Sequence, residues 1–411
     1  MTRSRSVLLA ALLLMCAAPA LAGCGARTAT TSEAGALAGA GTAPGAGWER
    51  LPDPPLAPRT HAVMTEVAGD LLIVGGWEFL CPPGADCATP AARLTDGAIL
   101  DPGSGTWRPI AAAPYGLLAG ETNAVTVGTT MYALAECTDG DRCRQSRLVA
   151  YDTVADAWDD LGPVPAPGYR ALLAVGERLA LVSGSDERGV RPDRVFDPAT
   201  GTWTDLPADP LPPSFDRQWV ALDDRTLALT ATPLTAVEDG GDDTVHAAVL
   251  TLLGDAGGPG DPAEAVWRRV DDVPGDGGYG FTATSAGGLR NGRMNPGPGW
   301  LLDPVAGTWR TLPDPGIGGR SDLLGVLEAT TSTWDVPNSI GWTTADARVL
   351  AYDVATDSYL EVTAPPERRE VYDEASAGLG QSLVVYGGQR WDRSSDGELV
   401  GEVWRWTPPS P

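Results

Sequence analysis

A short pattern made of an aspartate, a turn and an aromatic residue recurs through most of the chain, and it constrains the fold more than any other feature. Its clearest copy runs from Asp197 to Trp203, with Leu206 three residues later. In every full copy the aromatic residue lies six positions after the aspartate. The copies begin at Asp101, Asp152, Asp197, Asp261, Asp303 and Asp353, and they end at Trp107, Trp158, Trp203, Trp267, Trp309 and Tyr359.

This unit predicts a strand, a tight turn and a second strand. An aspartate at the first turn position accepts a backbone N–H, and the proline that follows it fixes φ. Gly201 allows the positive φ that such a hairpin needs. One hairpin cannot bury its apolar face alone, so the repeats are expected to stack around an axis. The aromatic residues from Trp48 onward are 59, 51, 45, 64, 42 and 50 residues apart, which fits propeller blades of roughly 40–50 residues with insertions.

Each repeat is expected to hold four strands, a to d. In the first repeat these are Thr60–Thr65, Leu71–Gly75, Gly97–Leu100 and Trp107–Ile110. Seven sets of a, b and c strands follow Trp48, but only six aromatic d strands follow them. The fifth repeat, around Phe281–Arg293, has the least regular pattern. We therefore predict an all-β, seven-bladed propeller of four-stranded blades, closed by the N-terminal strand Trp48–Leu51; six or eight blades are the alternatives.

Several segments resemble kelch repeats. Ile73-Val74-Gly75-Gly76 and Val385-Tyr386-Gly387-Gly388 resemble the double glycine that ends kelch strand b. Pro58-Arg59-Thr60-His61 resembles the opening of kelch strand a, and Tyr151-Asp152 with Trp158 resembles strands c and d. The resemblance covers residues 48–411 and is weaker in the middle repeats. It implies a kelch-like, galactose oxidase-like propeller but no particular function, because propellers host many activities.

The N-terminus has the features of an export signal. Arg3 and Arg5 precede an apolar run from Val7 to Met15 that is too short to span a membrane. Leu21-Ala22-Gly23-Cys24 resembles the bacterial lipobox, which implies removal of residues 1–23 and a lipid on Cys24. The alternative is an ordinary signal peptide cut near Ala20 or Ala22. Residues 24–47 are rich in Ala, Gly and Thr and predict a flexible tether.

Export and charge together limit the possible partners. A lipid on Cys24 would anchor the protein to the outer leaflet of the cytoplasmic membrane, at the cell surface. The sequence contains 54 acidic and 29 basic residues, for a net charge of −25. This charge argues against binding to nucleic acid or to an anionic membrane surface. We expect a monomer.

The cysteines of an exported protein are expected to form disulfides. Cys16 leaves with the signal peptide, and four cysteines remain beyond Cys24. Their C-x5-C spacing favours Cys81–Cys87 and Cys137–Cys143, each closing a loop after a b strand. The alternatives are bridges between the two loops, or a zinc site formed by all four thiolates.

The residue inventory limits the chemistry. A galactose oxidase-like copper site uses two histidines, two tyrosines and a Cys–Tyr crosslink, but His61 and His246 lie in different repeats and no cysteine is spare. No flanking motif supports a Ser-His-Asp triad, and His61 is expected in the core. The repeated aspartates resemble sialidase Asp-boxes and are expected to be structural. The acidic run 238–243 lacks calcium-loop spacing. No metal or cofactor is expected.

The strand-a arginines are the best binding candidates. They resemble the kelch arginines that surround the mouth of the channel, and tryptophans in the long loops of the same face are expected to join them. Arginine and tryptophan are frequent anchors of binding surfaces. The candidates are Arg59, Arg170, Arg217, Arg320, Arg369, Trp77, Trp334 and Trp391. In the alternative interpretation the arginines only pair with neighbours such as Asp216, Asp322 and Glu370.

Two functions remain open. The first is a non-catalytic scaffold that binds a protein or glycan ligand at this face, motivated by the tether and the missing catalytic groups. The second is a carbohydrate-active enzyme of the kind seen in the kelch-like periplasmic sialic-acid mutarotases. That reaction would use the arginines with Glu121 or Glu370, although no motif selects these residues.

Overall fold

The structure is a computed structural model. It describes residues 47–82, 85, 87, 92–119, 124–135, 146–165, 170–237, 241, 244–253, 264–274, 281–283, 288–291, 299–314, 323–328, 348–353, 356–366, 368, 371–391 and 396–408. The chain divides into two compact units, residues 1–41 and 42–411, and all described residues belong to the second. No helix within the described ranges is long and apolar enough to cross a membrane.

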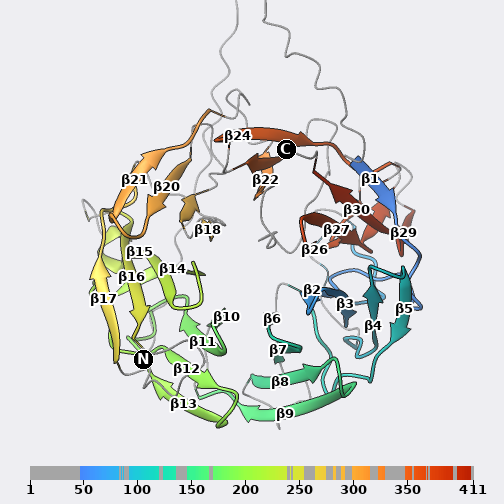
Figure 1. The fold of residues 1–411 in the computed structure, drawn as a ribbon, viewed down its shortest axis with the longest axis horizontal. Coiled ribbons are helices and arrows are strands. Elements are labelled where there is room, and N and C mark those ends of the chain that lie inside the picture. The colour runs from blue at the N-terminus through green and yellow to red at the C-terminus, as the bar shows by residue number, and fades with distance from the viewer. Residues whose placement is uncertain are drawn as a thin grey trace, which may run out of the picture. The chain divides into compact units, whose positions relative to one another are not determined.

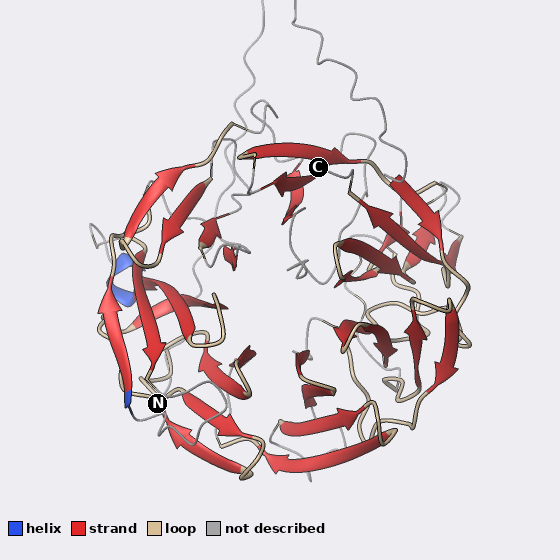
Figure 2. Cartoon of the chain, in the orientation of Figure 1, coloured by secondary structure: helices blue, strands red, loops and turns tan. Residues whose placement is uncertain are grey.

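The second unit is built of β-strands, with a short 3-10 helix, η2 (Leu234–Val237), among the described residues (Figure 2). The strands pair in chain order into sheets, which we number 1 to 7. Sheet 1 holds β2 (Val63–Val67), β3 (Asp70–Val74), β4 (Gly97–Asp101) and β5 (Thr106–Pro109). Sheet 2 holds β6 (Ala124–Val127), β7 (Thr130–Ala135), β8 (Arg147–Asp152) and β9 (Ala157–Pro163). Sheet 3 holds β10 (Arg170–Val175), β11 (Arg178–Ser183), β12 (Arg194–Asp197) and β13 (Thr202–Asp205).

The remaining sheets follow the same order. Sheet 4 holds β14 (Ser214–Ala221), β15 (Thr226–Pro233), β16 (His246–Leu252) and β17 (Ala265–Arg269). Sheet 5 holds β18 (Phe281–Ala283), β19 (Leu289–Asn291), β20 (Trp300–Asp303) and β21 (Thr308–Thr311). Sheet 6 holds β22 (Leu323–Glu328), β23 (Arg348–Asp353) and β24 (Ser358–Val362). Sheet 7 holds β26 (Ala375–Leu379), β27 (Ser382–Tyr386), β30 (Val403–Thr407) and β1 (Gly47–Arg50). A small extra sheet holds β25 (Val371–Tyr372), β28 (Gln389–Trp391) and β29 (Gly397–Leu399).

Neighbouring sheets contact one another through their first strands. β2 contacts β6, β6 contacts β10, β10 contacts β14, and β14 contacts β18. β26 of sheet 7 contacts β2 of sheet 1. In Figure 1 these first strands lie nearest the middle of the picture and the last strands lie outermost. The described part of the chain is therefore all-β, with six antiparallel four-stranded sheets, an arrangement compatible with a β-propeller.

The apolar core lies between the sheets. One cluster of buried side chains joins sheets 1 and 2 around Leu72 and Val149, and another joins sheets 3 and 4 around Val182 and Leu229. Further clusters join sheets 2 and 3, 4 and 5, 5 and 6, and 6 and 7. A seventh cluster packs Leu71 and Ile73 of sheet 1 against Val384 and Val403 of sheet 7. Each sheet thus buries one face against each neighbour, which no single hairpin could do.

The repeated turn has the predicted structure. In four copies the aspartate Oδ1 accepts a backbone N–H from two residues later, at 2.8–2.9 Å; the aspartates are Asp101, Asp152, Asp197 and Asp303. Gly105, Gly201 and Gly307 take the positive φ that ends the turn. Two copies have an aspartate at that position, Asp156 and Asp357, with φ of 49° and 52°.

These two aspartates also join neighbouring sheets. Tyr151 Oη donates to Asp156 Oδ1 at 2.6 Å, and Arg108 from sheet 1 lies 3.7 Å from the same atom. The hydrogen bond from Tyr151 lowers the pKa of the Asp156 carboxyl group. In the second copy, Asp357 accepts from Tyr352 and from Arg310 of sheet 5. The side chain that replaces glycine in the turn therefore contributes contacts that glycine could not make.

The repeated tryptophans link each last strand to the sheet before it. In five of these tryptophans the indole Nε1 donates to a backbone carbonyl just beyond the last strand of the neighbouring sheet. The pairs are Trp107 with Pro52 at 2.7 Å, Trp158 with Ala111 at 2.8 Å, Trp267 with Pro207 at 2.8 Å, Trp309 with Asp271 at 2.8 Å, and Trp48 with Thr363 at 2.6 Å. The regular intervals between the aromatic residues in the sequence therefore correspond to contacts that join neighbouring sheets.

The N-terminal strand pairs with the C-terminal one, as the count of strands predicted. β1 is antiparallel to β30, with Trp48 opposite Trp406 and Arg50 opposite Trp404. The Leu51 N–H donates to the Val403 carbonyl at 3.0 Å, and the Leu51 side chain is buried. Trp48 itself is half-buried. The first and last described segments of the chain therefore belong to one sheet.

Sheet 6 departs from the pattern of its neighbours. It has three strands among the described residues, and β22 pairs in parallel with β23 rather than antiparallel. Sheet 5, where the sequence pattern was least regular, has only three-residue β18 and β19 but keeps the usual order.

Candidate functional site

Two glycines, one after the second strand of sheet 1 and one after that of sheet 7, allow close approach of backbone within each sheet. A Cβ on Gly76 would lie 2.6 Å from the Thr60 carbonyl oxygen, and one on Gly388 would lie 2.7 Å from the Tyr372 carbonyl oxygen. Both glycines have positive φ, of 94° and 101°. A side chain at either position would displace the segment that leads into the first strand of its sheet. The double glycines therefore position His61 and Asp373, which follow Thr60 and Tyr372.

Buried arginines within these leading segments hold them in place through hydrogen bonds. Arg59 is almost fully buried, and its Nη1 and Nη2 donate to the Asp96 carboxylate at 2.7 and 2.9 Å. Arg59 Nη1 also donates to the Gly75 carbonyl at 3.0 Å. The hydrogen bonds from Arg59 lower the pKa of the Asp96 carboxyl group. Arg368 takes the equivalent position in sheet 7 and donates to the Gly387 carbonyl and to Glu374.

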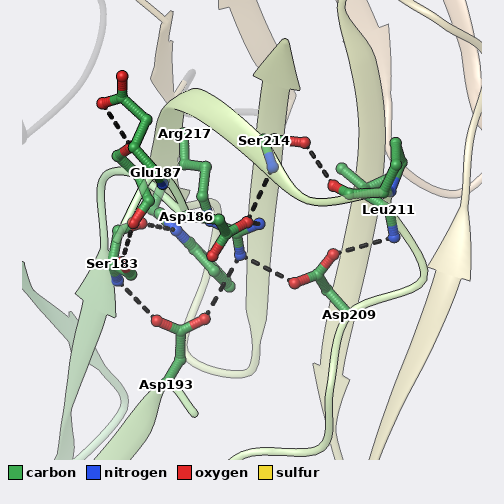
Figure 3. Close-up of polar contacts among 11 residues, drawn as sticks. Ser183, Asp186, Glu187, Asp193, Asp209, Leu211, Ser214 and Arg217 are labelled. Atoms are coloured by element: carbon green, nitrogen blue, oxygen red, sulfur yellow. Dashed lines mark hydrogen bonds and ion pairs between the residues drawn. The ribbon is translucent and has the colours of Figure 1, made fainter. Parts of the chain in front are cut away.

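Arg217 lies in sheet 4 at the centre of a buried carboxylate cluster (Figure 3). Its Nη1 is 3.1 Å from Asp186 Oδ2, and its Nη2 is 2.8 Å from Asp209 Oδ2 and 3.5 Å from Asp193 Oδ2. Each carboxylate also accepts a backbone N–H, from Ser214, Leu211 and Ser183 respectively. One guanidinium group therefore lies within ion-pair distance of three carboxylates away from solvent.

The two candidate arginines whose side chains are described are thus structural. Arg59 and Arg217 are buried and paired within the chain, so they offer no free charge to a ligand. Arg59 pairs with Asp96, and Arg217 pairs with the three carboxylates described above. Asp216, a neighbour considered as a partner, is not among these carboxylates. The Arg170 side chain, Arg320 and Arg369 lie outside the described residues. The described arginine that supports sheet 7 is Arg368, the neighbour of the predicted Arg369.

His61 and Asp373 meet at the junction of sheets 1 and 7. His61 Nε2 lies 3.6 Å from Asp373 Oδ1, and the His61 N–H donates to the Asp373 carbonyl at 3.1 Å. Both residues have positive φ, of 52° and 56°. The two side chains are 35% and 36% exposed, so the expectation of a core histidine is wrong. The double glycines hold His61 at the end of its sheet, where solvent reaches the ring.

Trp77 and Gln389 complete this group. The rings of Trp77 and His61 lie 5.6 Å apart, and Trp77 pairs with Thr60 through two backbone hydrogen bonds of 2.9 Å. Gln389 Nε2 donates to Asp373 Oδ2 at 2.5 Å. Trp391 lies two residues beyond Gln389 on β28, hence on the same side of that strand. We call His61, Trp77, Asp373, Gln389 and Trp391 the junction site. Trp77 and Trp391 are half-buried rather than fully exposed.

A loop closed by a disulfide bond contacts the junction site. Cys81 and Cys87 form the predicted bridge, with an S–S distance of 2.07 Å. The Cys81 N–H donates to Gln389 Oε1 at 2.9 Å, so a sheet 1 loop orients the amide that holds Asp373. The predicted Cys137–Cys143 bridge, Cys24 and Trp334 lie outside the described residues. Sequence reasoning missed His61, Asp373 and Gln389, because their meeting depends on how the first and last sheets pack.

Other polar features of the described residues are structural. His246 Nδ1 is 2.9 Å from both Asp272 Oδ1 and Arg269 Nη2, and the ring is buried. Within the described ranges, no three or more His, Cys, Asp or Glu side chains are arranged so that they could hold a metal ion. A cavity of about 440 Å³ lies at the β20–β21 turn, lined by Leu301, Val305, Trp309 and neighbouring residues. None of its lining residues belongs to the junction site.

No family model matches the chain, and no curated protein matches it. Among solved structures, one described as "Structure of YjhT" is similar, with a TM-score of 0.41. The sequences are 12% identical, and the match covers 86% of this chain and 95% of that chain.

Glu374 behind the junction site is expected to make stability depend on pH. The side chain is buried, its Oε2 accepts from Arg368 at 2.8 Å, and its Oε1 has no hydrogen-bond partner among the described residues. Burial raises the pKa of Glu374 to about 7 despite the pull of Arg368. Because the folded pKa lies above the unfolded one, this group favours folding below about pH 4.5. As the pH rises toward 7, this contribution is lost, and the free energy of unfolding falls by up to about 3 kcal/mol.

The Glu374→Gln variant tests this expectation in thermal melts from pH 4.5 to 8. The wild type should lose stability across this window, and the variant should lose much less. The pKa is lowered for other carboxyl groups, such as those of Asp96 and Asp156. These groups reduce stability only at lower pH, as the pH falls toward their folded pKa values. Parallel pH profiles for wild type and variant would contradict the role assigned to Glu374.

Proposed function

We propose that this protein is a lipid-anchored extracytoplasmic scaffold, a seven-bladed kelch-like propeller that binds a ligand at the junction site without performing chemistry on it. The blade count has support from the seven buried clusters that join successive sheets. Closure by the N-terminal strand has support from β1–β30 pairing and from the Trp48 and Trp107 indole contacts on either side of β1. Export and anchoring rest on residues 1–24.

The observation that carries the binding proposal is the partly exposed His61–Asp373 pair beside Trp77. Non-glycine residues with positive φ are uncommon, and such residues cluster where a site demands a special side-chain position. His61 and Asp373 share this backbone conformation and point toward each other across two sheets. Aromatic and polar side chains gathered at the edge of a rigid scaffold are typical of binding surfaces. The described arginines near the site are engaged internally and provide no catalytic group.

Ligand capture with site variants tests this proposal. The full-length protein, displayed on cells, is probed with a glycan array and by photo-crosslinking to surface proteins. Trp77→Ala should weaken binding by about 2 kcal/mol or more, and His61→Asn should also weaken it while tolerating positive φ. Asp216→Asn is the matched control, since Asp216 has a φ of 49° in sheet 4. Equal capture by all variants would contradict a site at the junction. Sugar epimerisation with turnover, followed by NMR, would contradict a purely binding role.

A further inference from the structure

We infer that the junction site binds the cationic side chain of a partner protein, with the cation placed between the Trp77 ring and the Asp373 carboxylate. This inference rests on the proposed binding function and names the class of partner. It follows from three properties of the site: an accessible acceptor, adjacent aromatic surface, and the absence of a free cation among its described neighbours.

The acceptor is Asp373 Oδ1. The other carboxylate oxygen, Oδ2, is held by the Gln389 amide at 2.5 Å, and Gln389 is itself held by the Cys81 N–H. Oδ1 faces His61 Nε2 at 3.6 Å, which is longer than a hydrogen bond. The Gln389 amide orients the carboxylate, the Asp373 side chain is 36% exposed, and Oδ1 accepts no hydrogen bond from a described residue, its partner at ion-pair distance being His61 Nε2. An ammonium or guanidinium group makes the strongest hydrogen bonds to such an oxygen.

The aromatic surface lies next to this acceptor. Trp77 stands 5.6 Å from the His61 ring, and His61 faces Asp373. Tryptophan is the best of the side chains that attract a cation to the ring face. Trp77 and Asp373 both neighbour the His61 ring, and an indole and a carboxylate so placed favour a positive group over a neutral one.

The charges around the site disfavour an anionic ligand. Arg59 is paired with Asp96, Arg368 with Glu374, and Arg390 with Glu398 at 2.7 Å. Glu78, next to Trp77, is exposed. Carboxylates therefore outnumber guanidinium groups at this junction, within a chain of net charge −25. A ligand that bears a carboxylate or phosphate would be repelled, whereas a basic one would be attracted.

The openness of the site favours a protein over a small molecule. Small ligands bind in concave cavities that bury most of their surface. The described junction side chains other than Gln389 are about a third exposed or half-buried, so they are accessible to the surface of another protein. A lysine or arginine carried on a partner protein needs no enclosing cavity, because the surrounding contacts come from the partner's own surface.

Two peptides that differ only in charge provide the test. The full-length protein is titrated with a Gly-Lys-Gly peptide, capped at both ends, and with the same peptide acetylated at Nζ, and tryptophan fluorescence reports binding. The acetylated peptide should bind at least about tenfold more weakly, because charge-assisted hydrogen bonds are roughly twice as strong as neutral ones. Asp373→Asn should reduce the affinity for the lysine peptide by a similar factor and remove most of its salt dependence.

Asp216→Asn removes the same charge at an equivalent backbone conformation in sheet 4 and should leave binding unchanged. Equal loss in both variants would mean that the peptide binds the acidic surface generally, and it would overturn the inference. Equal binding of the two peptides would also overturn it. If a glycan or an acidic ligand instead binds and is lost in Trp77→Ala, the junction still binds a ligand, but the cationic partner is excluded.

Discussion

Deleting residues 25–52 is expected to lower the melting temperature sharply, whereas deleting residues 25–45 should leave it at the wild-type value. The longer deletion removes β1, which supplies four residue pairs with β30, and it removes the buried Leu51. Losing a buried leucine alone costs about 2–5 kcal/mol. The deletion also exposes the β30 edge and removes the carbonyl acceptor of Trp107.

The shorter deletion serves as the control, because it removes only residues whose composition predicts a tether. Differential scanning fluorimetry and light scattering on both proteins check the result. Aggregation of the longer deletion would agree with an open β30 edge. Equal melting temperatures would show that β1 does not close the unit, and the seven-blade count would have to be revised.

Replacing Arg217 with methionine is expected to destabilise the protein by about 3–5 kcal/mol. The substitution keeps much of the side-chain volume but removes the guanidinium group that Asp186, Asp193 and Asp209 share. Those carboxylates are at most 12% exposed, so solvent cannot take over the role of the guanidinium group. Thermal or urea unfolding of the purified variant measures the loss.

Two further variants separate charge from packing. Adding Asp209→Asn to Arg217→Met should restore part of the stability, because it removes one repelling charge and keeps an acceptor for the Leu211 N–H. Arg50→Met, in the exposed Arg50–Asp53 pair, should cost less than about 1 kcal/mol. A loss in Arg217→Met no larger than in Arg50→Met would contradict the view that Arg217 balances the cluster.

Local chemistry made much of the fold predictable. The aspartate turns, the positive-φ glycines and the strands around Leu71, Val195 and Val403 follow from short-range rules, and they lie where the sequence indicated. Short-range rules predicted the candidate site less well. Arg59 and Arg217 were assigned to a binding face by resemblance, but their environment depends on acidic residues 37 and 8 positions away in sequence. His61 was expected in the core, and its exposure depends on sheet 7.

If the junction site binds a ligand as proposed, the site also determines when the protein can bind during its synthesis. Its residues come from 61–77 and from 373–391, so a chain that has emerged only as far as the fifth sheet has no site at all. A ligand that recognises the junction would distinguish finished molecules from truncated ones, since both ends of the polypeptide must be present and packed together. Ligand binding would then report that both segments have been made and have folded together.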